Sequence, residues 1–217
     1  ILMKFSREQL LLYAVTDRAW TGRQTLYEQI ESALKGGVTM VQLREKGLAE
    51  AEFIKEAVRV RELCGRYGVP LIINDSLETA LASGADGVHV GLEDLPVAEI
   101  RRRAGRDFII GATAKTVEQA KKAEADGADY LGVGAVFPSP TKKNAIRITV
   151  EQLREICGAV SIPAAAIGGI GRENMPQLAG TGISGAALVS AVFSAGDIEA
   201  ECRLLRKMAE EVVHGGK

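Results

Sequence analysis

The chain has 217 residues, of which 47% are hydrophobic, and its 27 Lys and Arg residues nearly balance its 28 Asp and Glu residues. This composition is typical of a globular protein, and it excludes both an intrinsically disordered chain and the basic surface that nucleic-acid binding requires. Because no apolar run reaches the length of a membrane span and the N-terminus lacks a signal-peptide pattern, we expect a cytoplasmic protein without a membrane partner, folded as a single domain over residues 1–217.

Short apolar runs recur along the chain, with amphipathic segments between them. Continuous apolar runs of this length are typical of strands that are covered on both faces, as in a parallel barrel. The predicted strands span residues 11–15, 40–43, 71–73, 87–90, 108–111, 130–133, 164–167 and 185–189.

The segments between these runs favour helices. After the first run, apolar residues from Leu26 to Leu34 share one helical face, and Gly36-Gly37 can end the helix. A longer helix is predicted from about residue 49 to 67, and Pro96 suits the first turn of another. The last helix is predicted from residue 198 to 213.

A strand, a helix and two loops in every unit of about 27 residues indicate a single (β/α)8 TIM barrel. A doubly wound open sheet is the alternative, but no GxGxxG motif follows the first strand. Gly84-Ala85-Asp86 and Gly127-Ala128-Asp129 form a weak repeat just before two strands, at the bottom of such a barrel. Their aspartates are therefore expected to be structural.

Cys64, Cys157 and Cys202 are isolated, which predicts buried thiols rather than disulfides or a zinc site.

Charged residues follow the second, third and fourth strands, at the end where barrel enzymes carry their active sites. Arg44 and Lys46 would project to one side of an extended segment, where an anion such as phosphate would offset their repulsion. Asp75 and Asp94 would meet at one rim and need a shared cation, and oxygen ligands favour Mg²⁺. The alternatives are that the cations are solvated, that the aspartates cap helices, or that Glu45 or Glu93 is the metal ligand.

Later strands end in small and hydroxyl residues that suit an anion. The loop after the sixth strand offers Ser139, Thr141 and Lys142, and the seventh strand leads into Gly168-Gly169-Ile170-Gly171. Ser190 ends the eighth strand, and the seventh and eighth loops are the usual phosphate site of this fold. Such glycines also simply form turns. His89 is expected to be a satisfied residue of the barrel, and Tyr13, Phe137 and Trp20 to form either a flat apolar wall or core.

Taken together, several of these motifs resemble the thiamine-phosphate synthase family, over nearly the whole chain from Tyr13 to Ser190. The resemblance implies a reaction in which a hydroxymethylpyrimidine pyrophosphate and a hydroxyethylthiazole phosphate give thiamine phosphate and pyrophosphate. The motifs that carry it are Gln42-Leu43-Arg44-Glu45-Lys46, Ile73-Asn74-Asp75, Gly87-Val88-His89-Val90-Gly91, Glu93-Asp94-Leu95 and the segment from Val133 to Lys143.

The resemblance also implies roles for individual residues. The pyrophosphate falls to Arg44, Lys46, Asn74 and Lys142, Mg²⁺ to Asp75 and Asp94, and the pyrimidine to Gln42, with the Thr113 hydroxyl in reach of it. The expected catalytic residues are Arg44, Lys46, Thr113 and Lys142, and those for the thiazole phosphate and the neighbouring anion are Ser139, Thr141, Gly169 and Ser190.

Three residues depart from the family pattern: Ser76 replaces an arginine, Leu92 a glutamine and Lys115 a histidine. They leave two other functions open, a thiazole tautomerase and a noncatalytic protein that binds the same ligands. The retained cations and aspartates, and the lysine at position 115, argue against the tautomerase. The expected partners are small molecules, and a homo-oligomer is left open.

Overall fold

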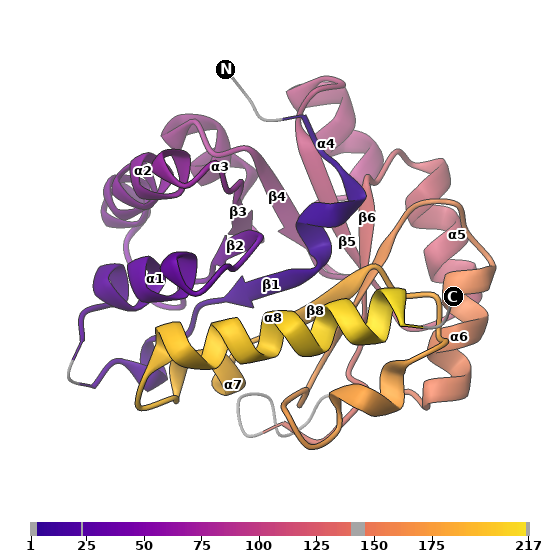
Figure 1. Cartoon of the computed structure of the whole chain (residues 1–217). Coiled ribbons are helices and arrows are strands. Elements are labelled where there is room, and N and C mark those ends of the chain that lie inside the picture. The colour runs from indigo at the N-terminus through magenta and orange to yellow at the C-terminus, as the bar shows by residue number, and fades with distance from the viewer. Residues whose placement is uncertain (1–3, 23, 140–145, 216–217) are drawn as a thin grey trace.

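The computed structural model describes residues 4–22, 24–139 and 146–215. Its strands are all parallel and close into a barrel in the order β1 to β8, with β8 paired to β1 (Figure 1). The predicted TIM barrel is therefore confirmed. The strands are β1 (Leu12–Val15), β2 (Met40–Leu43), β3 (Leu71–Asn74), β4 (Gly87–Val90), β5 (Ile109–Ala114), β6 (Tyr130–Gly134), β7 (Ala164–Ile167) and β8 (Gly185–Leu188).

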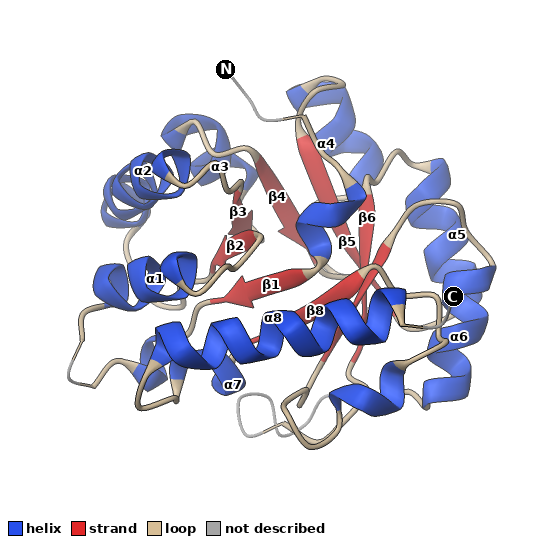
Figure 2. Ribbon diagram, in the orientation of Figure 1, coloured by secondary structure: helices blue, strands red, loops and turns tan. Residues whose placement is uncertain are grey.

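Helices surround the barrel on its outside (Figure 2). The C-terminal helix α8 lies beside α1 and packs on β1 and β8. The α-helices are α1 (Leu26–Lys35), α2 (Glu50–Arg66), α3 (Leu77–Ser83), α4 (Val97–Ala104), α5 (Val117–Ala125), α6 (Val150–Gly158), α7 (Ser190–Phe193) and α8 (Ile198–His214), and the 3-10 helices are η1 (Arg7–Leu10), η2 (Arg18–Trp20) and η3 (Met175–Leu178).

Two predicted elements differ from the structure by more than one residue at an end. The connection between β7 and β8 contains η3 in place of an α-helix, because Pro176 and the flanking glycines Gly171 and Gly180 disfavour a longer helix. Strand β5 extends to Ala114, beyond the predicted end at residue 111, because Thr113 and its neighbours continue to pair with β6. Thr113 therefore lies on a strand rather than in a loop.

The apolar side chains form two clusters. The larger one fills the space between the strands and the surrounding helices, and it includes Cys64 and Cys202, which are free, buried thiols. The smaller one lies inside the barrel, where Phe5 stacks on the Tyr130 ring and Leu10 fills the lower end. The interior cluster consists of Leu10, Tyr13, Val15, Met40, Ile72, Ile109, Tyr130, Ala165 and Ala187.

The repeated Gly-Ala-Asp segments hold the lower end of the barrel together. Asp86 is fully buried, and its carboxylate accepts the backbone N–H of Leu71 at 2.9 Å and contacts Arg61 of α2 at 3.2 Å. Asp129 accepts the backbone N–H of Ile110 at 2.7 Å, and Arg101 of α4 lies 2.7 Å from it. Both aspartates are thus structural, as their position in the sequence predicted.

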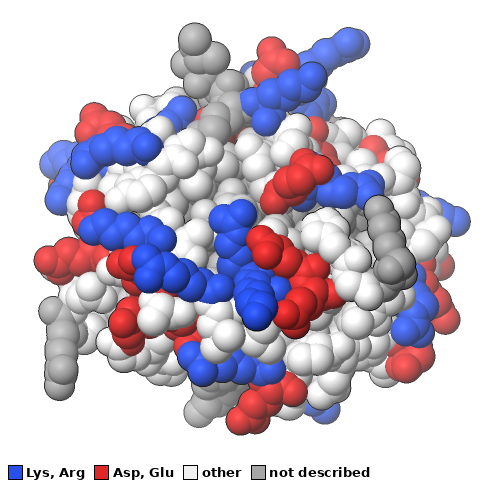
Figure 3. Space-filling view, viewed as in Figure 1, with Lys and Arg blue, Asp and Glu red and all other residues white. Residues whose placement is uncertain are grey.

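The surface carries both charges. Figure 3 shows basic and acidic side chains interspersed over one face. Surface ion pairs include Arg206–Glu210 on α8. Within residues 4–22, 24–139 and 146–215, no helix is both long and apolar enough to cross a membrane.

Candidate active site

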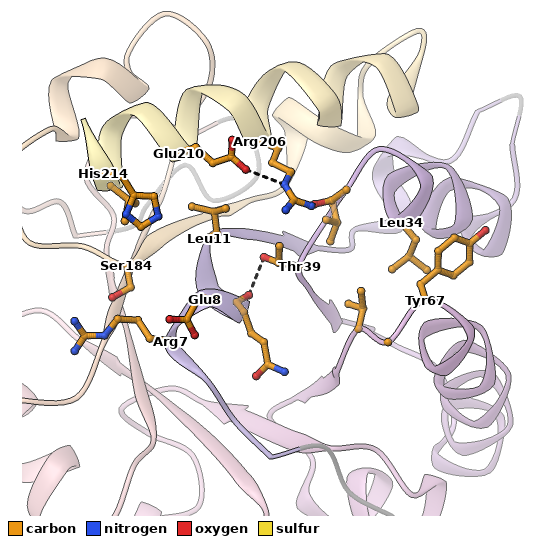
Figure 4. A pocket seen from close by; sticks show the side chains of 16 residues that line it. Arg7, Glu8, Leu11, Leu34, Thr39, Tyr67, Ser184, Arg206, Glu210 and His214 are labelled. Carbon is orange, nitrogen blue, oxygen red and sulfur yellow. Dashed lines mark hydrogen bonds and ion pairs between the residues drawn. The ribbon is translucent and has the colours of Figure 1, made fainter. Parts of the chain in front are cut away.

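Two cavities lie at opposite ends of the barrel. One, of about 670 Å³, is lined by residues that precede strands, such as Val38, Val69 and Ser184. Some of its polar side chains are bonded within the protein: Arg206 donates to Glu210, and the Thr39 hydroxyl donates to the backbone carbonyl of Gln9 (Figure 4). None of the predicted site residues lines it.

The other cavity, of about 290 Å³, lies at the C-terminal ends of the strands, where barrel enzymes have their active sites. Residues predicted separately from distant parts of the sequence meet here. Thr141 and Lys142 lie outside the described residues. The other predicted site residues all line this cavity, namely Gln42, Arg44, Lys46, Asn74, Asp75, Asp94, Thr113, Ser139, Gly169 and Ser190.

Arg44 is held in place by the end of β1. Its guanidinium lies 3.0 Å from the carboxylate of Asp17, and its backbone N–H donates to the hydroxyl of Thr16 at 2.9 Å. Thr16 is fully buried. The cation is therefore fixed before any ligand binds, which favours a role in holding an anion. Within the described part of the chain, Lys46 has no partner and is exposed beside it.

Asp75 and Asp94 lie together at the rim. Burial and then the adjacent Asp94, through a hydrogen bond and its charge, raise the pKa of Asp75 to about 6, although Asn74 and Arg44 act in the opposite direction. Asp75 has a left-handed backbone with φ of 63°, and its N–H donates to the His89 carbonyl at 2.8 Å. Asp94 closes a tight turn by accepting the N–H of Gly91 at 2.7 Å.

Neither aspartate caps a helix. Ser76, which stands where the family has an arginine, is the N-cap of α3 and accepts the N–H of Thr79 at 3.1 Å. Glu45 is bonded to Arg18 at 2.6 Å and does not line the cavity, and neither does Glu93. Of the four acidic residues considered as metal ligands, Asp75 and Asp94 are therefore the two that line the cavity.

The glycines after β7 are required by close packing. Gly168 and Gly169 have φ of 102° and 61°, and a Cβ on Gly169 would lie 2.0 Å from the carbonyl oxygen of Pro138. The loop after β6 is bonded to this segment, because the N–H of Phe137 donates to the Gly168 carbonyl at 3.0 Å. These glycines thus hold the loop that carries Ser139 against the cavity.

Lys115 has a role that the sequence did not reveal. Its ammonium donates to the Gly134 carbonyl at 2.7 Å and to the Ile146 carbonyl at 3.0 Å, and the side chain lines the cavity. It therefore joins the end of β6 to a later part of the chain. A lysine at this position gives no local signal of such a bond, because Ile146 is 31 residues away.

A chain of hydrogen bonds crosses the barrel interior below the cavity. The Gln42 amide donates to the Tyr13 hydroxyl at 2.7 Å, and the hydroxyls of Tyr13 and Tyr130 are 2.7 Å apart. The Tyr130 hydroxyl lies 3.2 Å from His89 Nδ1, and His89 Nε2 lies 3.1 Å from the Thr113 hydroxyl. Burial lowers the pKa of His89 to about 4, so its ring is neutral near pH 7.

Two strand glycines make room for this chain. A Cβ on Gly111 would lie 2.2 Å from Cζ of Tyr130 and 2.5 Å from Nδ1 of His89, and one on Gly132 would lie 2.9 Å from Cε1 of His89. Glycine inside a strand often marks such a close approach. These two positions are the sequence signal that could have identified Tyr130 and His89 as a buried polar cluster.

We expect Gly111→Ala to destabilise the protein by about 1–3 kcal/mol, because the added methyl group overpacks the barrel interior. Urea unfolding measures the change. The control is Gly158→Ala at the end of α6, where a Cβ would meet nothing within 4 Å and the effect should be small. Equal stability of the two variants would contradict the packing described for Gly111.

Comparisons with known proteins agree with the resemblance in the sequence. The sequence profile of the thiamine monophosphate synthase family matches residues 12–192. The thiamine-phosphate synthase of Ruminiclostridium cellulolyticum is 48% identical, covering 92% of this chain and 95% of its own. Thiamine-phosphate synthase 2 of Streptococcus pneumoniae is 45% identical over 96% of this chain and 99% of its own. The structure of a thiamine phosphate pyrophosphorylase from Pyrococcus furiosus superposes with a TM-score of 0.88 at 39% identity, covering 95% of this chain and 98% of that one.

Proposed function

We propose a specific reaction for this chain, which belongs to the thiamine monophosphate synthase family and is a transferase. The enzyme joins 4-amino-2-methyl-5-hydroxymethylpyrimidine pyrophosphate to 4-methyl-5-(2-hydroxyethyl)thiazole phosphate and releases pyrophosphate. The observation that carries this proposal is that three cationic side chains, two carboxylates and several hydroxyl groups line one cavity at the C-terminal ends of the strands.

The pyrophosphate end of the cavity is formed by β2 and β3. Arg44, fixed by Asp17, and the exposed Lys46 supply positive charge, and the Asn74 amide can donate to a phosphate oxygen. As the bond to the pyrimidine methylene carbon breaks, negative charge grows on the departing pyrophosphate. Donors already in place stabilise this charge without reorganisation.

Asp75 and Asp94 suit Mg²⁺. Burial and then the neighbouring Asp94 raise the pKa of Asp75, and a cation shared by the two carboxylates would offset both effects. Their ligand atoms are oxygens, which Mg²⁺ prefers. Across the described part of the chain, no three His, Cys, Asp or Glu side chains group into a metal site. Water and phosphate oxygens would therefore complete the coordination. When bound, the metal ion would add positive charge at the pyrophosphate.

The substitution needs no nucleophilic side chain. The electron-rich pyrimidine stabilises the methylene cation left by pyrophosphate, and the thiazole nitrogen then attacks that carbon. The bond to the pyrophosphate oxygen breaks with its electron pair, and the new C–N bond forms from the nitrogen lone pair. The protein aligns the two rings and excludes water from the cation.

The thiazole phosphate is assigned to the opposite side of the cavity. Ser139 lies on the loop after β6, Gly169 exposes its backbone after β7, and Ser190 follows β8. The seventh and eighth loops are the usual phosphate site of TIM barrels. This arrangement would place the thiazole facing the pyrimidine bound between β2 and β5.

Lys115 favours the synthase over the tautomerase. The tautomerase needs a proton-transferring group at this position, whereas the Lys115 ammonium is used as a donor to two backbone carbonyls. The retained cations and carboxylates have no role in an isomerisation that releases no pyrophosphate.

The test is pyrophosphate release by the full chain with both substrates and Mg²⁺, with thiamine phosphate identified by mass. We expect release only when both substrates and the metal are present. Release without thiamine phosphate, or tight binding of both substrates without product, would contradict the proposal. Isomerisation of the thiazole phosphate alone would identify the tautomerase.

A further inference from the structure

The hydrogen-bond chain below the cavity has a direction, which begins at Gln42. The Gln42 amide nitrogen is a donor only, so the Tyr13 oxygen accepts its bond. The Tyr13 hydroxyl hydrogen must then be donated to the one other polar atom beside it among the described residues, the oxygen of Tyr130 at 2.7 Å. Both tyrosines are buried, so solvent does not supply another acceptor for this hydrogen.

The direction continues to Thr113. Because Tyr130 accepts from Tyr13, its own hydrogen is donated to Nδ1 of His89 at 3.2 Å, which leaves Nδ1 without a proton. The proton of this imidazole is therefore on Nε2, which donates to the Thr113 hydroxyl oxygen at 3.1 Å. His89 in this tautomer cannot take a proton from Thr113, so the pair is not a base and a nucleophile.

The two ends of the chain face the cavity with opposite character. Thr113 accepts from His89, so its own hydrogen is left to donate, and no acceptor for it lies among the described residues. The Gln42 amide nitrogen donates to Tyr13 inside the barrel, so the amide oxygen Oε1 remains free to accept. In the described part of the chain, no donor is bonded to this oxygen. The two ends of this hydrogen-bond chain therefore offer the cavity one donor, at β5, and one acceptor, at β2.

We propose that Tyr13, Tyr130 and His89 are positioning residues that fix this polarity and thereby make the enzyme select an aminopyrimidine over its oxo analogue. An aminopyrimidine edge presents an amino donor beside a ring-nitrogen acceptor, which complements Gln42 Oε1 and the Thr113 hydroxyl. The 4-oxo analogue presents a carbonyl acceptor beside a ring N–H donor, with the two exchanged. This inference rests on the proposed function, because it concerns the pyrimidine substrate.

The tautomer of His89 can be measured without any substrate. The chain has only 2 histidines, so ¹⁵N-histidine labelling gives few NMR signals, and His214→Gln assigns them. We expect His89 to be neutral and protonated on Nε2 in the ligand-free protein at pH 7. A ring protonated on Nδ1 would overturn the proposal, whatever the enzyme's reaction proves to be.

The selectivity is measured as kcat/KM for the 4-amino substrate divided by that for the 4-oxo analogue. We expect the wild-type enzyme to favour the amino substrate by about 100-fold or more, because the wrong edge leaves buried polar groups unpaired. Tyr130→Phe frees His89 to change tautomer, and we expect the ratio to fall by about tenfold. The KM for the thiazole phosphate should not change.

Tyr27→Phe is the matched control, since its hydroxyl is bonded to Arg66 on the outside of the barrel. Tyr13→Phe is a second variant, which frees the Gln42 amide to turn and should also lower the ratio. Ratios within twofold of wild type in both interior variants would overturn the proposal. If the wild type converts neither substrate, the proposed function fails instead, and the NMR measurement still decides the tautomer.

Discussion

Asp94→Asn is expected to lower kcat for thiamine phosphate formation about 10²- to 10³-fold, by analogy with the loss of one preorganised charge-stabilising contact. The amide oxygen of asparagine can still accept the N–H of Gly91, so the turn after β4 is kept and the free energy of unfolding should change little. The carboxylate, however, is lost as the proposed ligand for Mg²⁺. Steady-state kinetics at saturating Mg²⁺ and urea unfolding measure the two effects. Asp94→Ala, which also removes the acceptor of the Gly91 N–H, should abolish activity while the barrel still folds.

Glu93→Gln is the control for this prediction, because Glu93 is the adjacent acidic residue and does not line the cavity. It should retain nearly full activity. Full activity in Asp94→Asn as well would remove Asp94 from the metal assignment.

Asp94→Asn is also expected to change the pKa of Asp75. Burial and then Asp94 raise the pKa of Asp75 to about 6. Removing the neighbouring negative charge should lower this pKa toward the ordinary range, with burial still opposing the fall. Carboxyl-carbon NMR titration of the metal-free, ligand-free protein measures the change. An unchanged pKa would show that the two carboxyl groups do not interact in solution.

Asp86→Ala is expected to cause the largest loss of stability, about 3–5 kcal/mol, because it removes one partner of a buried ion pair. The carboxylate is fully buried, and without it the N–H of Leu71 loses its acceptor and Arg61 loses its ionic partner, keeping its bond to the Gly84 carbonyl. Urea unfolding followed by circular dichroism measures the loss. At urea concentrations below its unfolding midpoint, the Asp86→Ala variant should remain active, since Asp86 lies at the end of the barrel opposite the active-site cavity.

The control is Asp126→Ala, which breaks the surface pair with Lys122 on α5. Exposed pairs of this kind contribute about 0–1 kcal/mol, so its effect should be small. Similar losses in the two variants would show that Asp86 does not stabilise the barrel through its buried contacts.

The sequence by itself determined the barrel, and it predicted which of the described residues line the cavity at the C-terminal ends of the strands. Short apolar runs with helical segments between them predict parallel strands. Among residues 4–22, 24–139 and 146–215, the topology brings the site residues chosen near the ends of such runs to one rim. Arg44, Asp75 and Asp94 could be chosen in this way because the carboxyl ends of all the strands of a parallel barrel face the same side.

The tertiary structure alone decided how these residues are held. In the sequence, Tyr13 and Tyr130 belong to predicted apolar strands, and His89 is expected only to be a satisfied residue of the barrel. Their hydroxyl and imidazole groups meet only when β1, β4 and β6 close around the same interior. Lys115 reaches a carbonyl 31 residues away. Local patterns record which face of a strand is apolar, whereas hydrogen-bond partners across a closed barrel depend on strand register and on glycines such as Gly111 that leave room for them.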